Sequence, residues 1–363
     1  MQSDIHTKEV GNKDRAQADR GRGHGSTGKV LNRRASVEES QRERNECWFV
    51  SMELVDKGRT WKGEEGVFTE LVERLGVQNV QFDELYSIDK ESLLAVAPVY
   101  AVVFLFKYSK LDREYAAKKQ PIDGEYDPDY AEKGIFFANQ TIQNACATQA
   151  VLNSLLNKLD DIEIGEELHN LRSFIEGFDP EMAGETLSNS ETLRSVHNSF
   201  SAPKFIDSDQ LPPPDMDDKD DGLFHFITYL NINNTIYELD GLKQYPIKHE
   251  TLDAPDHFYD VLPRVLQRRI DKYQGEIRFS LIAITNNKLE QYKLLGDDMS
   301  VQQELVKRET WKQENKFRRH DFPKLTVALL KNISKGMSDE EWEQLLNSAR
   351  SKSLARQSQR FLQ

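Results

Sequence analysis

Cysteine is scarce in this chain, because its 363 residues contain only Cys47 and Cys146. Two isolated cysteines cannot form a disulfide framework, and they lack the CxxC spacing or clustered histidines of a zinc site. The chain also lacks long apolar runs, and its N-terminus lacks the apolar stretch of a signal peptide. We therefore expect neither a membrane span nor a secretory signal. The sequence therefore predicts a protein of a reducing compartment that needs no metal and no cofactor.

An excess of positive charge is missing too, since 61 Asp and Glu outweigh 48 Lys and Arg and give a net charge of −13. This balance argues against nucleic acid as the main partner and is compatible with a basic substrate. Residues 1–45 are polar and carry few large apolar side chains. We expect them to form a disordered tail, because they cannot bury enough surface to fold alone.

The most informative stretch is 140–159, in which Cys146 stands where a polar loop meets a helical pattern. The helix is predicted by apolar residues at i, i+3, i+4 and i+7 spacing, namely Leu152, Leu155, Leu156 and Leu159. A helix N-terminus presents unpaired N–H groups and favours an anion such as a thiolate. A small residue packed at a helix start would fit this position equally well.

A second constellation lies in 223–241, where alternating apolar residues flank Asn233 and Asn234. This pattern predicts two strands joined by a tight turn. His225 begins the first strand and Asp240 ends the second, so the hairpin brings a carboxylate beside an imidazole. For His225 alone, a core histidine whose hydrogen bonds are satisfied is the alternative.

Gln140 precedes Cys146 by six residues, on the loop that approaches the helix. Its side-chain amide can donate a hydrogen bond to an oxyanion, together with the backbone N–H of Cys146. Cysteine, histidine and aspartate in this chain order, each at the end of a regular element, are typical of thiol hydrolases. A lone glutamine on a loop is ordinarily a solvated side chain.

Several segments resemble the ubiquitin C-terminal hydrolases, a group of papain-like cysteine proteases. The matching motifs are QTIQNACATQA (140–150), VHNSF (196–200), FHF (224–226) and YELDGL (237–242), with GVFTELVERLG (66–76) and PVYAVVFLFKY (98–108) nearer the N-terminus. The resemblance implies an α+β papain-like fold, with a central antiparallel sheet flanked by helices. It also implies Cys146 as nucleophile, His225 as general base and proton donor, Asp240 as the acid that orients it, and Gln140 as oxyanion stabiliser.

The resemblance also implies a domain order. The catalytic domain is expected at 46–285, with 201–222 as a crossover loop that drapes over the active site and limits the size of leaving groups. ENKFRRHDFPKLTVALLK (314–331) resembles the C-terminal helical extension of the proteasome-associated branch, so 286–363 is expected to dock on a partner. His197 in VHNSF is not the expected catalytic histidine, because FHF matches that motif.

These similarities predict a deubiquitinating thiol hydrolase that cleaves after the C-terminal glycine of ubiquitin. The expected partners are ubiquitin conjugates and a ubiquitin-receptor subunit of the proteasome, reached through the extension, with neither nucleic acid nor membrane. The expected location is cytoplasmic and nuclear. Two alternatives remain: a histone- or chromatin-directed deubiquitinase of the same family, and a ubiquitin-binding proteasome scaffold with little intrinsic activity.

Overall fold

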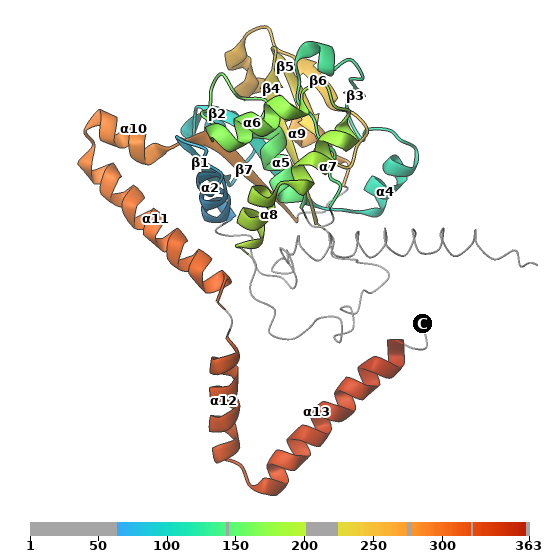
Figure 1. Ribbon diagram of the computed structural model, residues 1–363, viewed down its shortest axis with the longest axis vertical. Helices are drawn as coiled ribbons and strands as arrows, with labels where there is room; N and C mark the ends of the chain where they lie inside the picture. Colours follow the sequence, from blue (N-terminus) through green and yellow to red (C-terminus); the bar gives the residue numbers. More distant parts are fainter. Residues whose placement is uncertain (1–63, 143–144, 201–223, 274–277, 321, 361–363) are drawn as a thin grey trace, which may run out of the picture. The chain divides into compact units, whose positions relative to one another are not determined.

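The computed structural model describes residues 64–142, 145–200, 224–273, 278–320 and 322–360 (Figure 1). The predicted tail 1–45 and the predicted crossover loop 201–222 lie outside these residues. Within the described part of the chain, no helix has both the length and the apolar character needed to cross a bilayer.

A seven-stranded sheet forms the centre of the described fold, and every neighbouring pair of its strands is antiparallel. In spatial order the strands are β1 (Val80–Leu85), β7 (Phe279–Asn286), β2 (Val99–Lys107), β4 (Phe224–Ile232), β5 (Thr235–Leu239), β6 (Ile247–Thr251) and β3 (Glu125–Tyr126). The predicted α+β class with a central antiparallel sheet is confirmed.

Strand β2 is the central strand that its continuous apolar run predicts. Alternate side chains point to opposite faces of a sheet, and here each face carries its own apolar core. Ala101, Val103 and Leu105 belong to one core, whereas the side chains of Val102 and Phe104 belong to the other. Burial on both faces explains why this strand has no polar alternation.

Helices pack on both faces of the sheet. Those between the N-terminus of the described region and β7 are α2 (Glu64–Arg74), α3 (Lys90–Ala95), α4 (Lys110–Ala117), α5 (Cys146–Leu155), α6 (Gly165–Ile175), α7 (Pro180–Asn189), α8 (Glu191–Asn198) and α9 (Phe258–Asp271). The larger core contains residues of α2 and α5, and the smaller core contains residues of α3 and α9.

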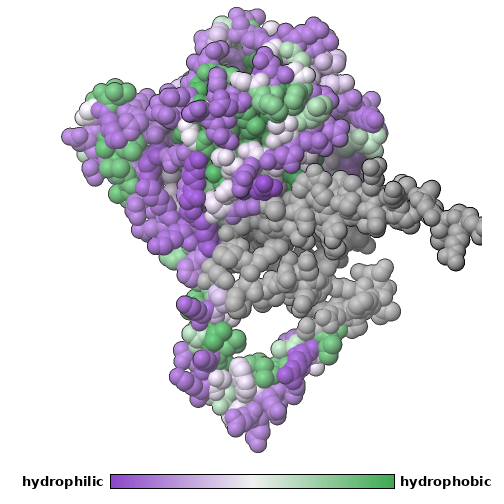
Figure 2. Space-filling view, in the orientation of Figure 1, coloured by the Kyte–Doolittle hydropathy of each residue, from purple (hydrophilic) through white to green (hydrophobic). Residues whose placement is uncertain are grey.

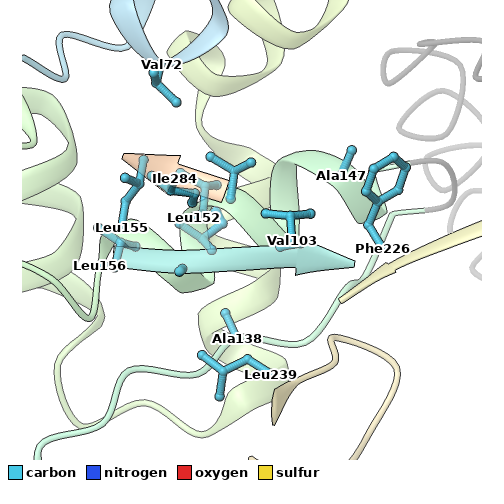
Figure 3. Close-up of a cluster of buried hydrophobic side chains, with 14 of the residues drawn as sticks. Val72, Val103, Ala138, Ala147, Leu152, Leu155, Leu156, Phe226, Leu239 and Ile284 are labelled. Atoms are coloured by element: carbon cyan, nitrogen blue, oxygen red, sulfur yellow. The ribbon is translucent and has the colours of Figure 1, made fainter. Parts of the chain in front are cut away.

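Helix α5 is the most deeply placed helix, with all ten of its residues buried. Figure 3 shows Ala147, Leu152 and Leu155 of this helix in the larger core, together with Val103 of β2 and Phe226 of β4. Burying a leucine side chain contributes about 1.5–3 kcal/mol. Leu152 and Leu155 therefore hold α5 against the sheet, whereas Leu159, the last leucine of the predicted stripe, lies beyond the helix and is 41% exposed.

Residues 109–135 are charged and contain Tyr, Pro and Gly, a composition that predicts a loop, but α4 occupies Lys110–Ala117. Ser109 and Asp112 form a reciprocal capping box, in which the Ser109 Oγ accepts from Leu111 N and the Asp112 carboxylate accepts from Ser109 N at 2.7 Å. Such a cap satisfies N–H groups that a helix start leaves unpaired. The Ser109–Asp112 spacing was the available sequence signal.

The C-terminal region is helical, with α10 (Lys288–Leu295), α11 (Asp298–Arg318), α12 (Pro323–Lys335) and α13 (Asp339–Arg360). Ser300 and Gln303 have the spacing of a capping box, which predicts a helix start at Ser300. That prediction is wrong, because Asp297 caps α11 and accepts from Ser300 N at 3.1 Å. The sequence also predicts a helix that starts near Ser338 with Glu341 at its third position. Ser338 and Glu341 accept from each other's backbone N–H groups before α13, as this prediction requires.

Helix α11 packs on α2 through a close contact and several polar bonds. Trp311 lies over Gly66 so closely that a Cβ on this glycine would come within 2.5 Å of the indole Cγ. Asn315 donates to the Gly66 carbonyl at 3.1 Å, and Arg319 pairs with Glu70 at 2.9 Å. The division into 46–285 and 286–363 stays a prediction.

Candidate active site

Cys146 is the first residue of α5 and is 6% exposed. The preceding residue, Ala145, caps the helix without a side-chain hydrogen bond. The N–H groups of the first turn therefore keep their donor capacity at the point where the sulfur sits. The positive end of the helix dipole therefore lies beside the sulfur.

The β4–β5 hairpin brings His225 and Asp240 together as its alternating pattern predicts. Asn233 and Asn234 both have positive φ angles, of 50° and 57°, which is the conformation of a tight hairpin turn. His225 Nε2 and Asp240 Oδ1 are 2.6 Å apart, and both side chains are buried. The same oxygen accepts from the backbone N–H of Leu242 at 2.9 Å, which fixes the carboxylate.

His225 and Asp240 each favour the charged form of the other. Burial by itself lowers the pKa of His225, but the Asp240 carboxylate and a hydrogen bond with Cys146 raise that pKa to about 10. Burial raises the pKa of Asp240, yet the nearby imidazolium and Lys243 leave it below its usual value. Because Nε2 faces Asp240, Nδ1 is the ring nitrogen left to interact with Cys146. His225 therefore lies between the thiol and the carboxylate in its charged form.

Two aromatic rings hold the imidazole on its other sides. Phe106 and Tyr108 meet the His225 ring edge to face, with centroid distances of 5.8 and 5.9 Å. Phe106 also lies opposite His225 in the β2–β4 register. These rings restrict rotation of the imidazole, and no pattern in the sequence indicated them as neighbours.

Gln140 lies on the segment that leads to α5. Its backbone N–H donates to the Gly241 carbonyl at 2.9 Å, which ties it to the residue after Asp240. Its side-chain Nε2 donates to the Ile142 carbonyl at 2.9 Å. The second N–H of this amide makes no hydrogen bond with the described residues and remains able to donate to a substrate oxygen.

Amide side chains of α5, and one just beyond its C-terminal end, hold the approach segment, and sequence reasoning did not single them out. Asn153 accepts from the N–H of Ala138 at 3.0 Å and donates to its carbonyl at 3.1 Å. Gln149 donates to the same carbonyl at 2.9 Å. Asn157 makes the equivalent pair of bonds with Phe136. The spacing of four between these amides was the signal available in the sequence.

His197 lies apart from the His225–Asp240 pair, as expected from the motif match. Its Nδ1 is 2.7 Å from the hydroxyl of Thr148, one turn into α5. Burial lowers the pKa of His197 to about 4. A neutral imidazole with a hydroxyl partner is a structural histidine that supports the helix.

A buried ionic network lies behind the hairpin. Arg269 of α9 is 1% exposed and is 3.3 Å from Glu238 and 3.7 Å from Asp112. Its guanidinium also stacks 5.3 Å from the centroid of Phe106, the ring that contacts His225. Among the described residues, no group of three or more His, Cys, Asp or Glu side chains is arranged to hold a metal ion.

Comparison with known proteins agrees with this arrangement. The family model for ubiquitin carboxyl-terminal hydrolase, family 1, matches residues 62–271. Ubiquitin carboxyl-terminal hydrolase 2 of Schizosaccharomyces pombe is 41% identical over 303 residues, which span 81% of this chain and 96% of the relative. Ubiquitin carboxyl-terminal hydrolase isozyme L5 of Dictyostelium discoideum is 41% identical over 231 residues, which span 63% of this chain and 62% of that protein.

A solved structure has the same fold. It is the Trichinella spiralis UCH37 catalytic domain bound to ubiquitin vinyl methyl ester, which superposes with a TM-score of 0.51 at 31% identity. The similarity covers 62% of this chain and 94% of that one. The chain belongs to the ubiquitin carboxyl-terminal hydrolases of family 1, a family of cysteine-type deubiquitinating peptidases. Its type is that of isozyme L5 and UCH37. The predicted family and enzyme class are confirmed.

Proposed function

We propose that Cys146, His225, Asp240 and Gln140 carry out the hydrolysis of bonds formed by the C-terminal glycine of ubiquitin. The observation that carries this proposal is the 2.6 Å contact of His225 with Asp240, in a ring whose pKa is also raised by Cys146. An imidazolium held between a sulfur and a carboxylate is the arrangement that activates a thiol nucleophile. In this proposal Cys146 is the nucleophile and His225 is the proton carrier.

The acylation step follows from these positions. The Cys146 thiolate attacks the glycine carbonyl, a C–S bond forms, and the carbonyl electron pair moves to oxygen. Gln140 and the N–H of Cys146 donate to that oxyanion, and each such donor is worth about 10²–10³-fold in rate. His225 gives its proton to the leaving amine as the C–N bond breaks, which leaves a thioester.

The deacylation step reverses these roles. His225, now neutral, takes a proton from water, and the resulting hydroxide attacks the thioester carbonyl. A second oxyanion forms and collapses, the C–S bond breaks, and the thiolate returns to pair with the imidazolium. Asp240 keeps the ring in one orientation throughout, because its carboxylate is itself fixed by the N–H of Leu242.

Ubiquitin is the proposed substrate, and two observations support it. The Trichinella relative was crystallised with ubiquitin vinyl methyl ester, a reagent whose protein part is ubiquitin. The net charge of −13 also suits the tail of ubiquitin, which carries two arginines before its final glycines. Electrostatic attraction of this kind raises the rate of encounter more than the final affinity.

The proposed setting is the proteasome, in cytoplasm and nucleus, with trimming of ubiquitin chains as the task. Support comes from α12, whose apolar side chains are exposed and are visible as green patches in Figure 2. They are Leu325, Val327, Leu329, Leu330 and Ile333. An exposed apolar stripe on a helix is typical of a protein-binding face.

Hydrolysis of a fluorogenic amide on the C-terminus of ubiquitin tests the chemistry. Cys146→Ala is expected to abolish turnover while binding of ubiquitin persists, and Cys47→Ala is the matched control that keeps full activity. Turnover of Cys146→Ala near the wild-type rate would reject Cys146 as the nucleophile.

Affinity purification of the tagged full-length protein tests the setting. The double change Leu329→Ser and Ile333→Ser is expected to remove proteasome subunits from the purified material without lowering amide hydrolysis. The matched control is Leu294→Ser with Leu295→Ser, two apolar residues of α10 that are 89% and 71% exposed. Chromatin factors instead of proteasome subunits in the wild-type sample would contradict the proposal.

A further inference from the structure

Asn139 occupies an unusually constrained position, immediately before Gln140. Its backbone N–H donates to the carbonyl of Pro180, the first residue of α7, at 2.8 Å. Its carbonyl oxygen lies against Gly184 of the same helix, where an added Cβ would be 2.0 Å from that oxygen. Only a residue without a side chain fits at 184, so α7 fixes the backbone of Asn139 from one side.

The side chain of Asn139 reaches in the other direction. Its Nδ2 donates to the carbonyl of Gly241 at 3.1 Å and to the carbonyl of Lys243 at 2.7 Å. These two carbonyls belong to the turn that follows Asp240. Both N–H groups of the Asn139 amide therefore donate to the turn that follows Asp240, the acid of the His225–Asp240 pair.

Gln140 is held by the same turn. Its backbone N–H donates to the same Gly241 carbonyl at 2.9 Å. A Cβ on Gly241 would be 3.1 Å from both the N and the Cβ of Gln140, so the two segments touch. On the other side of Asn139, Ala138 is clasped by Asn153 of α5. Residues 138–140 thus connect the helix of Cys146 with the turn of Asp240.

We propose that Asn139 is a positioning residue, which acts through Gln140 by fixing the distance between the oxyanion donor and the nucleophile. This inference rests on the proposed role of Gln140. A hydrogen-bond donor helps a reaction only where it meets the developing charge, and a misplacement of about 1 Å can cost on the order of 100-fold in rate. The hydrogen bonds of Asn139 go to the carbonyls of Pro180, Gly241 and Lys243, and none of them goes to Cys146 or His225.

The test is a double-mutant cycle with the full-length protein and the ubiquitin amide substrate. Asn139→Ala is expected to lower kcat by about 10- to 100-fold and to leave KM within about twofold. In the Gln140→Ala background the same substitution is expected to lower kcat by less than about twofold, because the donor that it positions is already absent. Affinity for ubiquitin aldehyde, whose adduct with Cys146 places an oxygen where the oxyanion forms, should fall in parallel with kcat.

Asn157→Ala is the matched control, since it removes the same kind of amide clasp at Phe136, four residues before Gln140. It is expected to lower the urea midpoint and to keep kcat. Gly184→Ala is the second variant, because it displaces Asn139 while keeping its side chain. Alanine is otherwise a better helix former than glycine, so a fall in kcat here reflects the displacement of Asn139.

The outcomes separate the two proposals. If Gln140→Ala alone leaves kcat unchanged, the oxyanion role fails and this inference fails with it. If Gln140→Ala lowers kcat but Asn139→Ala and Gly184→Ala do not, only the inference is overturned. An equal loss from Asn139→Ala in both backgrounds also overturns it, because the residue would then act by a route that bypasses Gln140.

Discussion

The negative charge of Asp240 can be removed by one substitution that keeps the hydrogen bonds of this side chain. One oxygen, Oδ1, contacts both His225 Nε2 at 2.6 Å and the N–H of Leu242 at 2.9 Å. In Asp240→Asn an amide oxygen can take the same place and keep both hydrogen bonds. The substitution therefore removes the negative charge and leaves the local geometry in place.

The size of the effect follows from the pKa of His225. A rise from 6.5 to about 10 favours the imidazolium by roughly 5 kcal/mol, since one pKa unit corresponds to about 1.36 kcal/mol. Without the Asp240 charge, burial disfavours the imidazolium, and the pKa of His225 is expected to fall below neutral. The proton for the leaving amine is then absent at pH 7, and we expect kcat to fall by about 10²–10⁴-fold.

The assay combines turnover with NMR of histidine ring signals across pH 5–11. The wild-type His225 is expected to titrate near 10, whereas in Asp240→Asn it should be neutral at pH 7. The matched control is Asp127→Asn, a buried carboxylate that accepts from the Tyr237 hydroxyl at 2.7 Å and pairs with Lys133. A variant whose His225 still titrates near 10 would refute the electrostatic reasoning.

The pH dependence of the free energy of unfolding gives a second test of the same prediction. The folded pKa of His225 lies above its unfolded value, so the native state binds the extra proton between pH 6.5 and about 10. The stabilisation that comes from this shift of His225 is complete below pH 6.5, while Asp240 stays ionised, and is lost as the pH rises through about 10. The wild-type free energy of unfolding should therefore approach that of Asp240→Asn at high pH, and a constant gap would contradict the account.

Three further predictions concern a buried ion pair, a close contact between two helices and the hairpin turn. Arg269→Met should lower the free energy of unfolding by about 3–5 kcal/mol, because Glu238 and Asp112 would lose their buried cation; a loss below about 1 kcal/mol in urea unfolding would argue against this. Gly66→Ala should cost about 1–3 kcal/mol and speed hydrogen exchange in α11, since its Cβ would strike Trp311; unchanged exchange would contradict that contact. Asn234→Val should cost about 1 kcal/mol or more and Asn234→Gly little, because φ is 57° at this position; equal stabilities would exclude the predicted turn strain.

Local patterns in the sequence were enough to predict the elements that carry the site. The leucine spacing after Cys146 corresponds to α5 as far as Leu155, with Leu159 outside the helix, and the alternation around Asn233 corresponds to the β4–β5 hairpin. The continuous apolar run of β2 corresponds to the central strand. These features depend on neighbours within a few residues, so a single sequence contains them.

The parts that sequence reasoning missed depend on contacts between distant segments. The clasp of Ala138 by Asn153 and the close approach of Gly184 to Asn139 exist only once α5 and α7 are packed. The same holds for Phe106 and Tyr108 around His225. Helix α4 is a different case, because a local cap was present at Ser109 and its signal was outweighed by the charged composition of the segment.

The most direct test of the central claim is the location of the covalent bond formed with ubiquitin vinyl methyl ester. The chain has only two cysteines, so digestion of the adduct and peptide mass spectrometry assign the site without ambiguity. The account predicts modification of the peptide that contains Cys146, with Cys47 unmodified. Modification of Cys47 alone, or no adduct with the full-length protein, would contradict it.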